Sequence, residues 1–411
     1  MRKKQKKDQL LVDEQTYERL KSHLYSRRPV LGEDSPFSEM LQGMVNQILK
    51  GEMENFIEQE RTGQKKNKRN GKSVKKVLTN SGEIYVETPR DRNGDFEPEL
   101  IAKRERHLSS GLDEQILALY AQGNSVEDVR RLLKTMFGVE ISAGKISMIT
   151  DKVLPEIENW RNRELQSFYP IVYLDAIHFK VRNEGKYSTH AFYTVYSIDW
   201  EGNRDILGLY VQGSEGASKW GLILEDLKQR GIEDIFVVCT DNLTGFSEVI
   251  ADVFPRTIVQ KCVVHQVRNS LRYVDSKDAK KVVADLRKIY TATSLEQAQI
   301  ALDAFEVKWS KQYSYIVQQW RKNWDELMAF MNFSKEMRRM IYTTNPVEAV
   351  HRIMRKLIKS KAAWVSPTAL TKQLYLSLMQ NKKSWCRKAY RWIEVQRSIM
   401  EKYPERIPRK T

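Results

Sequence analysis

Three acidic residues that lie far apart in the sequence could together carry out metal-dependent chemistry. Asp175 lies inside the apolar stretch 171–180, whose β-branched and aromatic residues predict a strand. An unpaired neutral polar group in such a sheet costs about 2–7 kcal/mol, and a charge costs more. Asp241 directly follows the apolar run 235–239, and Glu348 lies near the start of a predicted helix. If the three carboxylates meet, they require counter-cations, and their hard oxygen atoms favour magnesium or manganese over zinc.

A pair of divalent ions would give these carboxylates a defined chemistry. Two metals about 3.5–4 Å apart stabilise both the attacking and the leaving oxygen of an in-line phosphoryl displacement. Nucleases, polymerases and DNA transposases use this reaction. Each acid alone has a simpler interpretation: an ion pair for Asp175, a helix N-cap for Asp241 and the acid of a capping box for Glu348.

The elements that must position these acids predict an α/β core. Strands are expected at 171–180, 191–198 and 205–211, then a helix at 218–229, a strand at 235–239, a helix at 243–254, a strand at 257–260 and a helix at 262–273. Three antiparallel strands followed by alternating helix and strand is the order of a ribonuclease-H-like mixed sheet flanked by helices. Residues 277–342 are helical in pattern, which predicts an all-helical insertion. Asn345 as N-cap and Pro346 at N1 then open a long helix.

The helix that carries Glu348 is amphipathic. Four cations lie at helical spacing on the side of the glutamate, namely Arg352, Arg355, Lys356 and Lys359. On this side of the helix they could contact phosphates. Its expected buried face consists of Val347, Val350, Met354 and Leu357. His351 on this helix and His178 are expected to be packing or surface residues without a catalytic role.

A Cys-x2-His pair adds a further candidate. Cys262 and His265 form half of a structural zinc site, but no second pair lies nearby in the sequence. Helical spacing places the two side chains on one face, with Arg268 and Asn269 one turn further on. We expect these residues to support the active site or to contact the scissile phosphate.

The N-terminal part combines a helix, a basic segment and a hairpin. Apolar residues recur at helical spacing across 37–57, which indicates a helix that packs within its domain or forms a dimer contact. The basic segment is rich in Asn and Gly, so a flexible arm is expected, and its phosphate contacts are assigned to Lys65, Lys66, Lys68, Arg69 and Lys72. A hairpin of strands 74–78 and 83–87 follows.

Three helices expected after residue 112 fit a helix-turn-helix arrangement. Ser125 begins the second helix and Ser142 the third, which is expected to continue to about residue 157. Lys145 and Ser147 would then face a DNA groove. A three-helix bundle without DNA contacts would produce the same pattern.

Composition limits the class of partner. The chain of 411 residues has a net charge of +16 and a pI near 9.5, which indicates a polyanionic partner such as nucleic acid, although a basic ribosomal or membrane-surface protein would share this charge. The sequence contains no run of about 18 apolar residues, so no membrane-spanning helix is expected. The basic N-terminus lacks a following apolar segment, so no signal peptide is expected. Three widely separated cysteines argue against a disulfide framework and for a reducing compartment.

Several stretches resemble the successive motifs of bacterial Mutator-type insertion-sequence transposases. They are Leu174-Asp-Ala-Ile-His-Phe-Lys180, Thr240-Asp-Asn-Leu-Thr-Gly245, Lys261-Cys-Val-Val-His-Gln-Val-Arg-Asn269 and Tyr342-Thr-Thr-Asn-Pro-Val-Glu348, preceded by Pro89-Arg-Asp-Arg-Asn-Gly94 and Leu119-Tyr-Ala-Gln-Gly123. The resemblance extends from about residue 65 to 380. It implies a DDE transposase with a ribonuclease-H-like core, in which Asp175, Asp241 and Glu348 bind two Mg²⁺ or Mn²⁺ ions.

The resemblance also implies the reaction and its partners. Water would cleave DNA at the ends of the element, and the freed 3′-hydroxyl would attack another phosphodiester. The expected partners are double-stranded DNA at the transposon ends and the target, and further copies of the chain in a dimer or larger oligomer, without a membrane. The expected location is the bacterial cytoplasm, at the nucleoid. Two alternatives are a ribonuclease-H-like structure-specific nuclease or resolvase, and a helix-turn-helix regulator without metal chemistry.

Seven regions are expected along the chain. They are an N-terminal helical region that could oligomerise (1–63), the basic arm and hairpin (64–108), the helix-turn-helix domain (109–165), the first part of the catalytic core (166–275), the helical insertion (276–340), the last core helix with Glu348 (341–380) and a basic tail (381–411).

Overall fold

The computed structural model describes residues 13–26, 35–62, 67–79, 82–103, 110–137, 140–183, 186–213, 216–342, 344–361 and 363–407. Contacts divide the chain into two compact units, Met1–Lys152 and Val153–Thr411, and each unit is described by itself. No helix among the described residues is long and apolar enough to cross a membrane.

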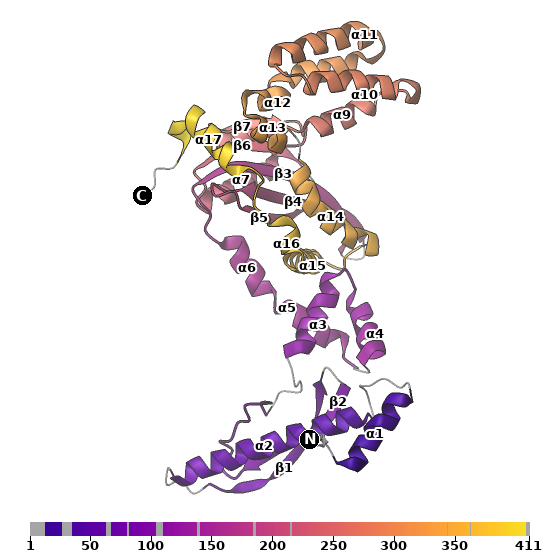
Figure 1. The fold of residues 1–411 in the computed structure, drawn as a ribbon, viewed down its shortest axis with the longest axis vertical. Coiled ribbons are helices and arrows are strands. Elements are labelled where there is room, and N and C mark those ends of the chain that lie inside the picture. Colours follow the sequence, from indigo (N-terminus) through magenta and orange to yellow (C-terminus); the bar gives the residue numbers. More distant parts are fainter. Residues whose placement is uncertain are drawn as a thin grey trace, which may run out of the picture. The chain divides into compact units, whose positions relative to one another are not determined.

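The first unit begins with two helices and a hairpin (Figure 1). These elements are α1 (Glu14–Tyr25), α2 (Pro36–Thr62), β1 (Arg69–Thr79) and β2 (Gly82–Asp91). The strands are antiparallel, as predicted, and α2 packs on them through an apolar cluster that includes Val45 and Val77. The side-chain oxygens of Gln42 and Asn46, one turn apart on α2, accept backbone N–H groups of β2 at 2.8 Å. Helix α2 therefore both covers the hairpin and satisfies part of its edge.

The basic segment is a strand from Arg69 onward, so our prediction of a flexible arm is wrong there. Asn67 is buried and donates a hydrogen bond from Nδ2 to Asp91 Oδ2 at 2.9 Å, which fixes the start of the hairpin. Arg69 and Lys72 pair with acids of α2 and β2 at 3.0 and 2.5 Å. Antiparallel pairing with β2 and these ion pairs outweigh the flexibility that Asn and Gly provide.

Three helices complete the first unit. They are α3 (Ser110–Ala121), α4 (Val126–Phe137) and α5 (Ala143–Asp151). The predicted capping box of α4 is present: Ser125 Oγ accepts the N–H of Asp128 at 3.0 Å, and Asp128 Oδ2 accepts the N–H of Ser125 at 3.1 Å. Ser142 caps α5 by accepting the N–H of Lys145.

The third predicted helix was expected to continue to about residue 157, but in the structure it is interrupted and this expectation is wrong. Helix α5 ends at Asp151, and α6 (Leu154–Asn162) follows with Pro155 in its first turn. Proline lacks the N–H that a helix interior requires, so it begins a new helix here. Helix α6 lies in the second unit, where Ile157 packs against Tyr375.

The second unit contains a five-stranded mixed sheet in the order β5-β4-β3-β6-β7. The sheet and its connecting helices are β3 (Phe168–Asn183), β4 (Lys186–Ile198), β5 (Arg204–Gln212), α7 (Ala217–Gln229), β6 (Asp234–Thr240), α8 (Phe246–Val253), β7 (Ile258–Lys261) and α9 (Val263–Leu271). Strand β3 is antiparallel to β4 and parallel to β6, and β6 is parallel to β7. These elements confirm the α/β class. Helix α8 begins three residues later than predicted, after Gly245 in a left-handed conformation.

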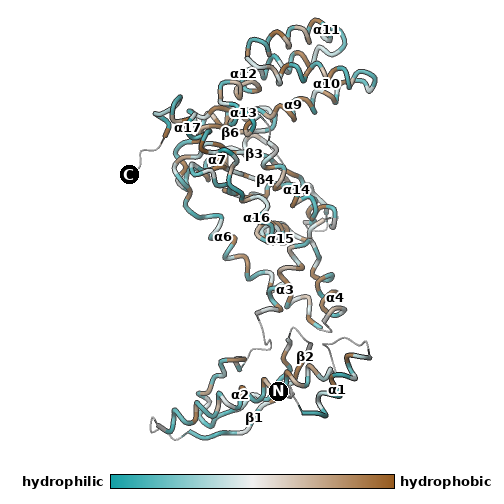
Figure 2. The backbone as a smooth tube through the Cα atoms, in the orientation of Figure 1, coloured by the Kyte–Doolittle hydropathy of each residue, from teal (hydrophilic) through white to brown (hydrophobic). Residues whose placement is uncertain are grey.

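The alternation of side chains along β3 separates two cores. Val172 and Leu174 pack beneath α7 and α8, whereas Ile171 and Tyr173 pack against the opposite layer of C-terminal helices. Strand β6, between these two cores, is apolar from Ile235 to Cys239 and carries the hydrophobic colour in Figure 2. Asp175 continues the series of Ile171 and Tyr173, so its carboxylate belongs to the face beneath the C-terminal helices.

The remaining elements are helical, as predicted for the insertion. They are α10 (Ser276–Tyr290), α11 (Leu295–Lys322), α12 (Trp324–Met328), η1 (Ala329–Asn332) and α13 (Lys335–Ile341), followed by α14 (Asn345–Ser360), α15 (Pro367–Gln380), α16 (Lys382–Trp385), α17 (Trp392–Lys402) and η2 (Pro404–Arg406). Buried Gln260 on β7 joins the insertion to the sheet, because its amide donates to the Leu327 carbonyl at 2.9 Å and accepts the Phe330 N–H at 2.6 Å.

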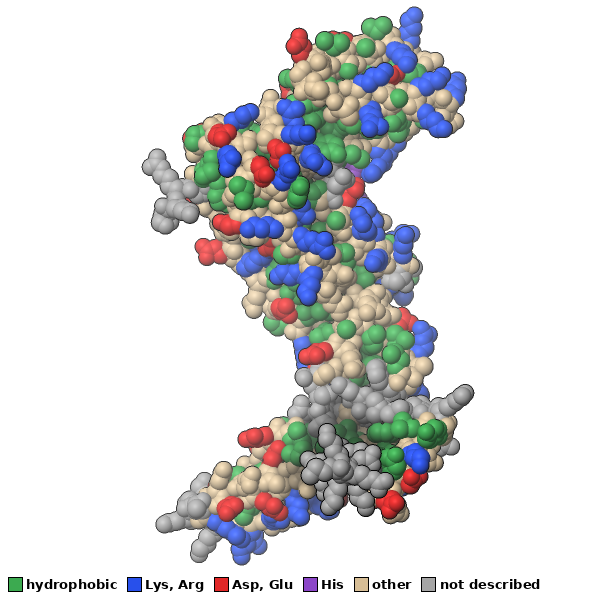
Figure 3. All heavy atoms as spheres, viewed as in Figure 1, with side chains coloured by type: hydrophobic (Ala, Val, Ile, Leu, Met, Phe, Trp, Pro, Cys, Tyr) green, Lys and Arg blue, Asp and Glu red, His purple; other side chains and the backbone are tan. Residues whose placement is uncertain are grey.

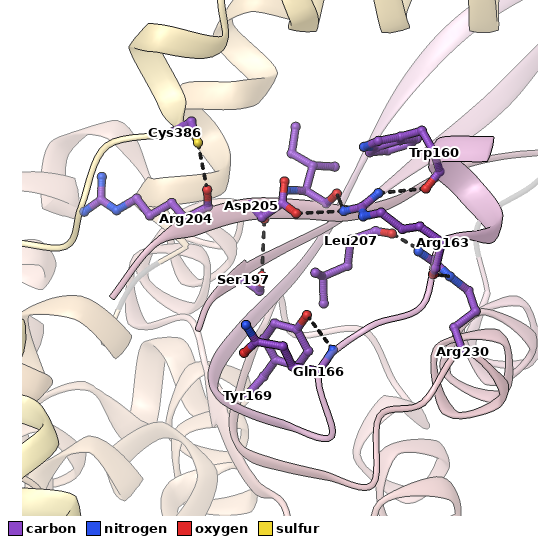
Figure 4. A network of polar contacts seen from close by, with 11 residues as sticks. Trp160, Arg163, Gln166, Tyr169, Ser197, Arg204, Asp205, Leu207, Arg230 and Cys386 are labelled. Atoms are coloured by element: carbon purple, nitrogen blue, oxygen red, sulfur yellow. Dashed lines mark hydrogen bonds and ion pairs between the residues drawn. The ribbon is translucent and has the colours of Figure 1, made fainter. Parts of the chain in front are cut away.

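Two arginines hydrogen-bond the segment that precedes β3 to strand β5 (Figure 4). Arg163, just after α6, donates to Asp205 Oδ2 at 2.7 Å and to the Ile206 carbonyl at 2.9 Å. Arg230, just after α7, donates to the carbonyls of Arg163 and Leu207. These bonds tie the segment that leads into β3 to the edge strand β5, and so fix where β3 begins.

Asp285 is the polar centre of the insertion and yields a stability prediction. Burial alone would raise the pKa of this carboxyl, but hydrogen bonds from Lys288, Lys308 and Trp309 outweigh burial and lower the pKa to about 2. A depressed pKa contributes stability above the unfolded value of about 4 and loses it as the pH falls towards about 2.

We therefore expect Asp285→Asn to lower the free energy of unfolding by about 1–2 kcal/mol at pH 7. The difference from the unchanged protein should shrink between about pH 5 and pH 2, as measured by urea denaturation with circular dichroism. Asp252→Asn, at an exposed position on α8, serves as the control. A difference that stays constant across this pH range would contradict the assignment.

Candidate functional site

Asp175 on β3 and Asp241 just after β6 follow the same step of a strand pairing. The parallel register of β3 and β6 ends with Leu174 opposite Thr240, and each aspartate is the next residue along the chain. Strand β6 stops there, whereas β3 continues, paired with β4. The aspartates therefore meet at the carboxyl end of β6, the position where α/β sheets place ligands.

Asp241 is not the N-cap that was considered for it alone, and the ionisable partner of Asp175 among the described residues is a histidine rather than a lysine or arginine. Asp175 is 8% exposed, and its Oδ1 accepts the N–H of Ala176 at 2.9 Å. Asp241 Oδ1 accepts the N–H of Leu243 at 3.3 Å in a loop, and Gly245 rather than Asp241 is the N-cap of α8. Both carboxylates thus accept a backbone N–H group from a residue close to them in sequence.

Helix α14 brings Glu348 to the same face of the sheet (Figure 1). The predicted apolar face is confirmed, because Val347, Val350, Met354 and Leu357 are all buried. The predicted cap is wrong: Thr344 is the N-cap, and its hydroxyl donates to Cys262 Sγ at 3.6 Å instead of capping the helix. Glu348 is therefore the fourth helical residue and not the acid of a capping box.

His351 is the site residue that sequence reasoning missed. It is fully buried one turn after Glu348, with Nδ1 3.4 Å from Asp175 Oδ2 and Nε2 3.0 Å from the Thr194 hydroxyl. The i+3 spacing from Glu348 and the helical spacing from Val347 and Met354 of the apolar face were the signals that could have identified it. His351 joins β3, β4 and α14 at the buried aspartate.

His265 on α9 lies near Glu348 and is influenced by the charges of both aspartates. Its Nε2 lies 3.9 Å from Glu348 Oε1, and Arg268 Nη2 lies at the same distance from that oxygen. The pKa of the His265 imidazole is raised first by its interaction with Cys262 and further by the charges of Asp175 and Asp241, although burial opposes the rise. His265 therefore interacts with acids carried by β3, by the loop after β6 and by α14.

Cys262 is paired with His265 electrostatically. Burial would raise the pKa of the Cys262 thiol, but hydrogen bonding and the charge of His265 lower it overall. The i, i+3 spacing predicted from the sequence thus places the two side chains together at the start of α9. Asn269 lies on the same helix and is half-buried.

The carboxylates of Asp175, Asp241 and Glu348 are the type of ligand that binds a hard divalent cation. Three carboxylates supply charged oxygen ligands, which Mg²⁺ and Mn²⁺ prefer. Their side chains do not converge as a ready ligand group: among the described residues, no three His, Cys, Asp or Glu side chains are arranged to hold a metal ion. His351, His265 and Arg268 instead lie 3.4–3.9 Å from carboxylate oxygens of Asp175 and Glu348. The backbone placement fits a metal site, and side-chain rotation would have to complete it.

The expected DNA-contacting cations fall into distinct groups. Those on α14 are all exposed and make no ion pair with a described residue, namely Arg352, Arg355, Lys356 and Lys359. Lys and Arg side chains are spread widely over the visible face of the second unit (Figure 3). On the first unit, Lys68 is exposed while Arg69 and Lys72 are ion-paired, and Lys65 and Lys66 lie outside the described residues. Lys145 and Ser147 are half-buried on α5.

Comparison with known proteins identifies relatives along most of the chain. The model of the family described as "Transposase, Mutator family" matches residues 14–388. The transposase for insertion sequence element ISRM3 of Rhizobium meliloti is 38% identical over 92% of this chain and 95% of its own length. A probable transposase of Corynebacterium diphtheriae is 38% identical over 71% of this chain and 84% of its own length. The solved structure titled "Drosophila P element transposase strand transfer complex" aligns with 70% of this chain and 84% of its own chain, at 10% identity and a TM-score of 0.28.

The contact between His351 and Thr194 yields a prediction for the site. His351→Leu and Thr194→Val should each lower the free energy of unfolding by about 1–3 kcal/mol, because each leaves a buried polar partner unsatisfied. The double variant should cost clearly less than the two single changes together, since both partners of the His351–Thr194 hydrogen bond are then removed. Urea denaturation of the four proteins measures this coupling. Strict additivity would show that the two side chains do not interact.

Proposed function

The chain belongs to the Mutator family of transposases, and we propose that it cuts DNA at the ends of its own insertion sequence with Asp175, Asp241 and Glu348 as the metal-binding acids. The observation that carries this proposal is the adjacent placement of Asp175 and Asp241 at the end of β6, with Glu348 facing His265. As a transposase, the chain is a DNA-cleaving and strand-transferring enzyme of the insertion-sequence type.

We further propose that the sheet is a ribonuclease-H-like core. An antiparallel β5-β4-β3 group extended by parallel β6 and β7, with helices on both faces, supports this assignment. The family indicates a divalent cofactor, and the three carboxylates would hold two Mg²⁺ or Mn²⁺ ions. When bound, such ions supply positive charge to the attacking and leaving oxygens of phosphoryl transfer.

The neighbouring residues have separable roles in this proposal. His351, whose Nε2 contacts the Thr194 hydroxyl, lies 3.4 Å from Asp175 Oδ2 and would position that carboxylate on the α14 face. Arg268 is exposed beside Glu348, where its guanidinium can reach a phosphate of the bound strand. His265, with a raised pKa, and Asn269 lie on the same helix and would contact the DNA near the bond that is cut.

Binding of the DNA ends is assigned to two surfaces. The exposed cations of α14 continue from Glu348 and would follow the phosphates next to the cut. In the first unit, α4 and α5 would form a helix-turn-helix, with Lys145 and Ser147 towards the groove and the basic residues of β1 on the backbone. Those basic residues are Lys68, Arg69 and Lys72, together with Lys65 and Lys66.

Joining two ends requires at least two copies of the chain at one time, so we propose a dimer or larger oligomer. Helix α2 supports this, because Met40, Met44 and Ile48 recur every four residues and are 37%, 54% and 47% exposed. An exposed apolar stripe opposite the face that covers the hairpin is suited to contact a second copy.

Asparagine or glutamine at the acids tests the mechanism. Asp175→Asn, Asp241→Asn and Glu348→Gln should each lower cleavage and strand transfer by about 10³-fold or more, because each removes a charged ligand. Affinity for the end should change little, since the cations that bind DNA remain. The assay uses labelled linear DNA that ends in the element's inverted repeat, with Mg²⁺ present.

Asp252→Asn, an exposed acid on α8, is the matched control and should stay active. Binding without cleavage by the unchanged protein would favour a regulator, and cleavage of branched DNA alone would favour a structure-specific nuclease. Full activity of any of the three acid variants would remove that acid from the proposed site.

A second prediction concerns the cations of α14. Changing Arg352, Arg355, Lys356 and Lys359 together to Gln should weaken end binding and reduce the slope of log affinity against log salt by about 0.9 per lost phosphate contact. The matched control changes Lys280, Lys281, Arg287 and Lys311 to Gln, which removes the same charge from exposed positions of α10 and α11. Equal effects of both variants would mean that α14 contributes only general charge.

A further inference from the structure

A polar pocket opens beside the carboxylates, at the junction of the sheet with the helical insertion. Its volume is about 200 Å³, and its walls come from the loop after β6, from α9 and from α11. Asn242 in this loop directly follows Asp241, and Gln266 on α9 directly follows His265. The pocket and the proposed cleavage site are therefore built on the same two elements.

Carboxamides dominate the lining. Asn242, Gln266, Asn269, Gln319 and Asn323 contribute to the wall, which contains no carboxylate and a single charged side chain, Arg272. The Nδ2 of Asn242 donates to Gln266 Oε1, whereas the buried Oδ1 of Asn242 has no hydrogen-bond partner among the described residues. A buried acceptor without a partner is costly, so the Asn242 amide has an unsatisfied hydrogen-bonding group next to the pocket.

Two tyrosines stand at the edge of this pocket. The rings of Tyr273 and Tyr315 lie 4.6 Å apart between centroids, and the residues are 57% and 46% exposed. Exposed aromatic faces beside a polar pocket offer a stacking surface for a planar ligand. Arg272 lies next to them and is exposed, so it can contact a phosphate outside the pocket.

These features select one class of ligand. A divalent cation would require carboxylates, and a phosphate inside the pocket would require several cations, which the lining lacks. Carboxamides carry both donors and acceptors and match the hydrogen-bonding edge of a nucleobase. The volume is below the range of about 300–1,000 Å³ typical of pockets for drug-sized ligands, and suits one planar base rather than a base pair.

We propose that this pocket binds a single nucleobase that leaves the DNA stack next to the bond that is cut. The proposal rests on the proposed DNA cleavage at Asp175, Asp241 and Glu348, and adds a binding site for the displaced base. The carboxamides would hold its edge, Tyr315 would stack on it or on its neighbour, and Arg272 would contact the adjoining phosphate.

An abasic-site scan of the DNA tests this proposal with the full chain. Labelled duplexes ending in the inverted repeat carry one abasic site at each position within five nucleotides of the cut. Single-turnover cleavage in Mg²⁺ is measured for the unchanged protein, for Tyr315→Ala and Gln319→Ala, which lie one turn apart on α11, and for Gln318→Ala. Gln318 is exposed on the same helix and does not line the pocket, so it is the matched control.

On intact DNA, Tyr315→Ala and Gln319→Ala should each slow cleavage by about tenfold, and Gln318→Ala should have no effect. At one abasic position this loss should fall below about twofold, because the base that uses the pocket is already absent. Losses that stay the same at every position, or no loss on intact DNA, would overturn the pocket proposal. Thermal unfolding midpoints equal to that of the unchanged protein establish that the variants are folded.

The variant Asp175→Asn distinguishes failure of the base-binding pocket from failure of the proposed metal-dependent cleavage site. If Asp175→Asn cleaves normally, the carboxylate assignment fails whatever the scan shows. If Asp175→Asn is inactive and the losses are independent of position, only the base-binding pocket is rejected.

Discussion

The arrangement of the second unit depends on the burial of one carboxylate, Asp175, beneath α14. A charge on an apolar face of a sheet needs compensation, and buried His351 lies 3.4 Å from it while Thr194 holds the opposite ring nitrogen. This contact links β3, β4 and α14 at one point. It fixes the rotation of α14 about its axis, so that Glu348 faces His265 one turn earlier while the apolar side stays buried.

Much of this arrangement could be predicted from the sequence, because the relevant signals are local. The strands around Asp175 and Asp241 follow from uninterrupted apolar runs, and the buried side of α14 follows from helical spacing. The capping box at Ser125 is likewise a short-range pattern. The α/β class and the helical insertion followed from the order of such segments.

The errors concern residues whose structure is decided by partners distant in sequence. Thr344 replaces Asn345 as the N-cap of α14, with its hydroxyl directed to Cys262 82 residues earlier. Arg69 and Lys72 are ion-paired on a strand because α2 and β2 supply acids. His351 is buried, as expected for a packing residue, and only the folded chain reveals that Asp175 lies beside it. The carboxamide pocket likewise combines α9, α11 and the loop after β6.

The central claim is that Asp175, Asp241 and Glu348 bind the catalytic metals, and a change of ligand softness tests it most directly. Cysteine at Asp175 or Asp241 replaces a hard oxygen with a softer thiolate, which binds Mg²⁺ poorly and Mn²⁺ better. DNA cleavage by Asp175→Cys and Asp241→Cys should therefore be lost in Mg²⁺ and recover at least about tenfold in Mn²⁺, while Asp252→Cys behaves like the unchanged protein in both. Cleavage that is equally low in both metals, or unchanged in Mg²⁺, would contradict metal binding by these aspartates.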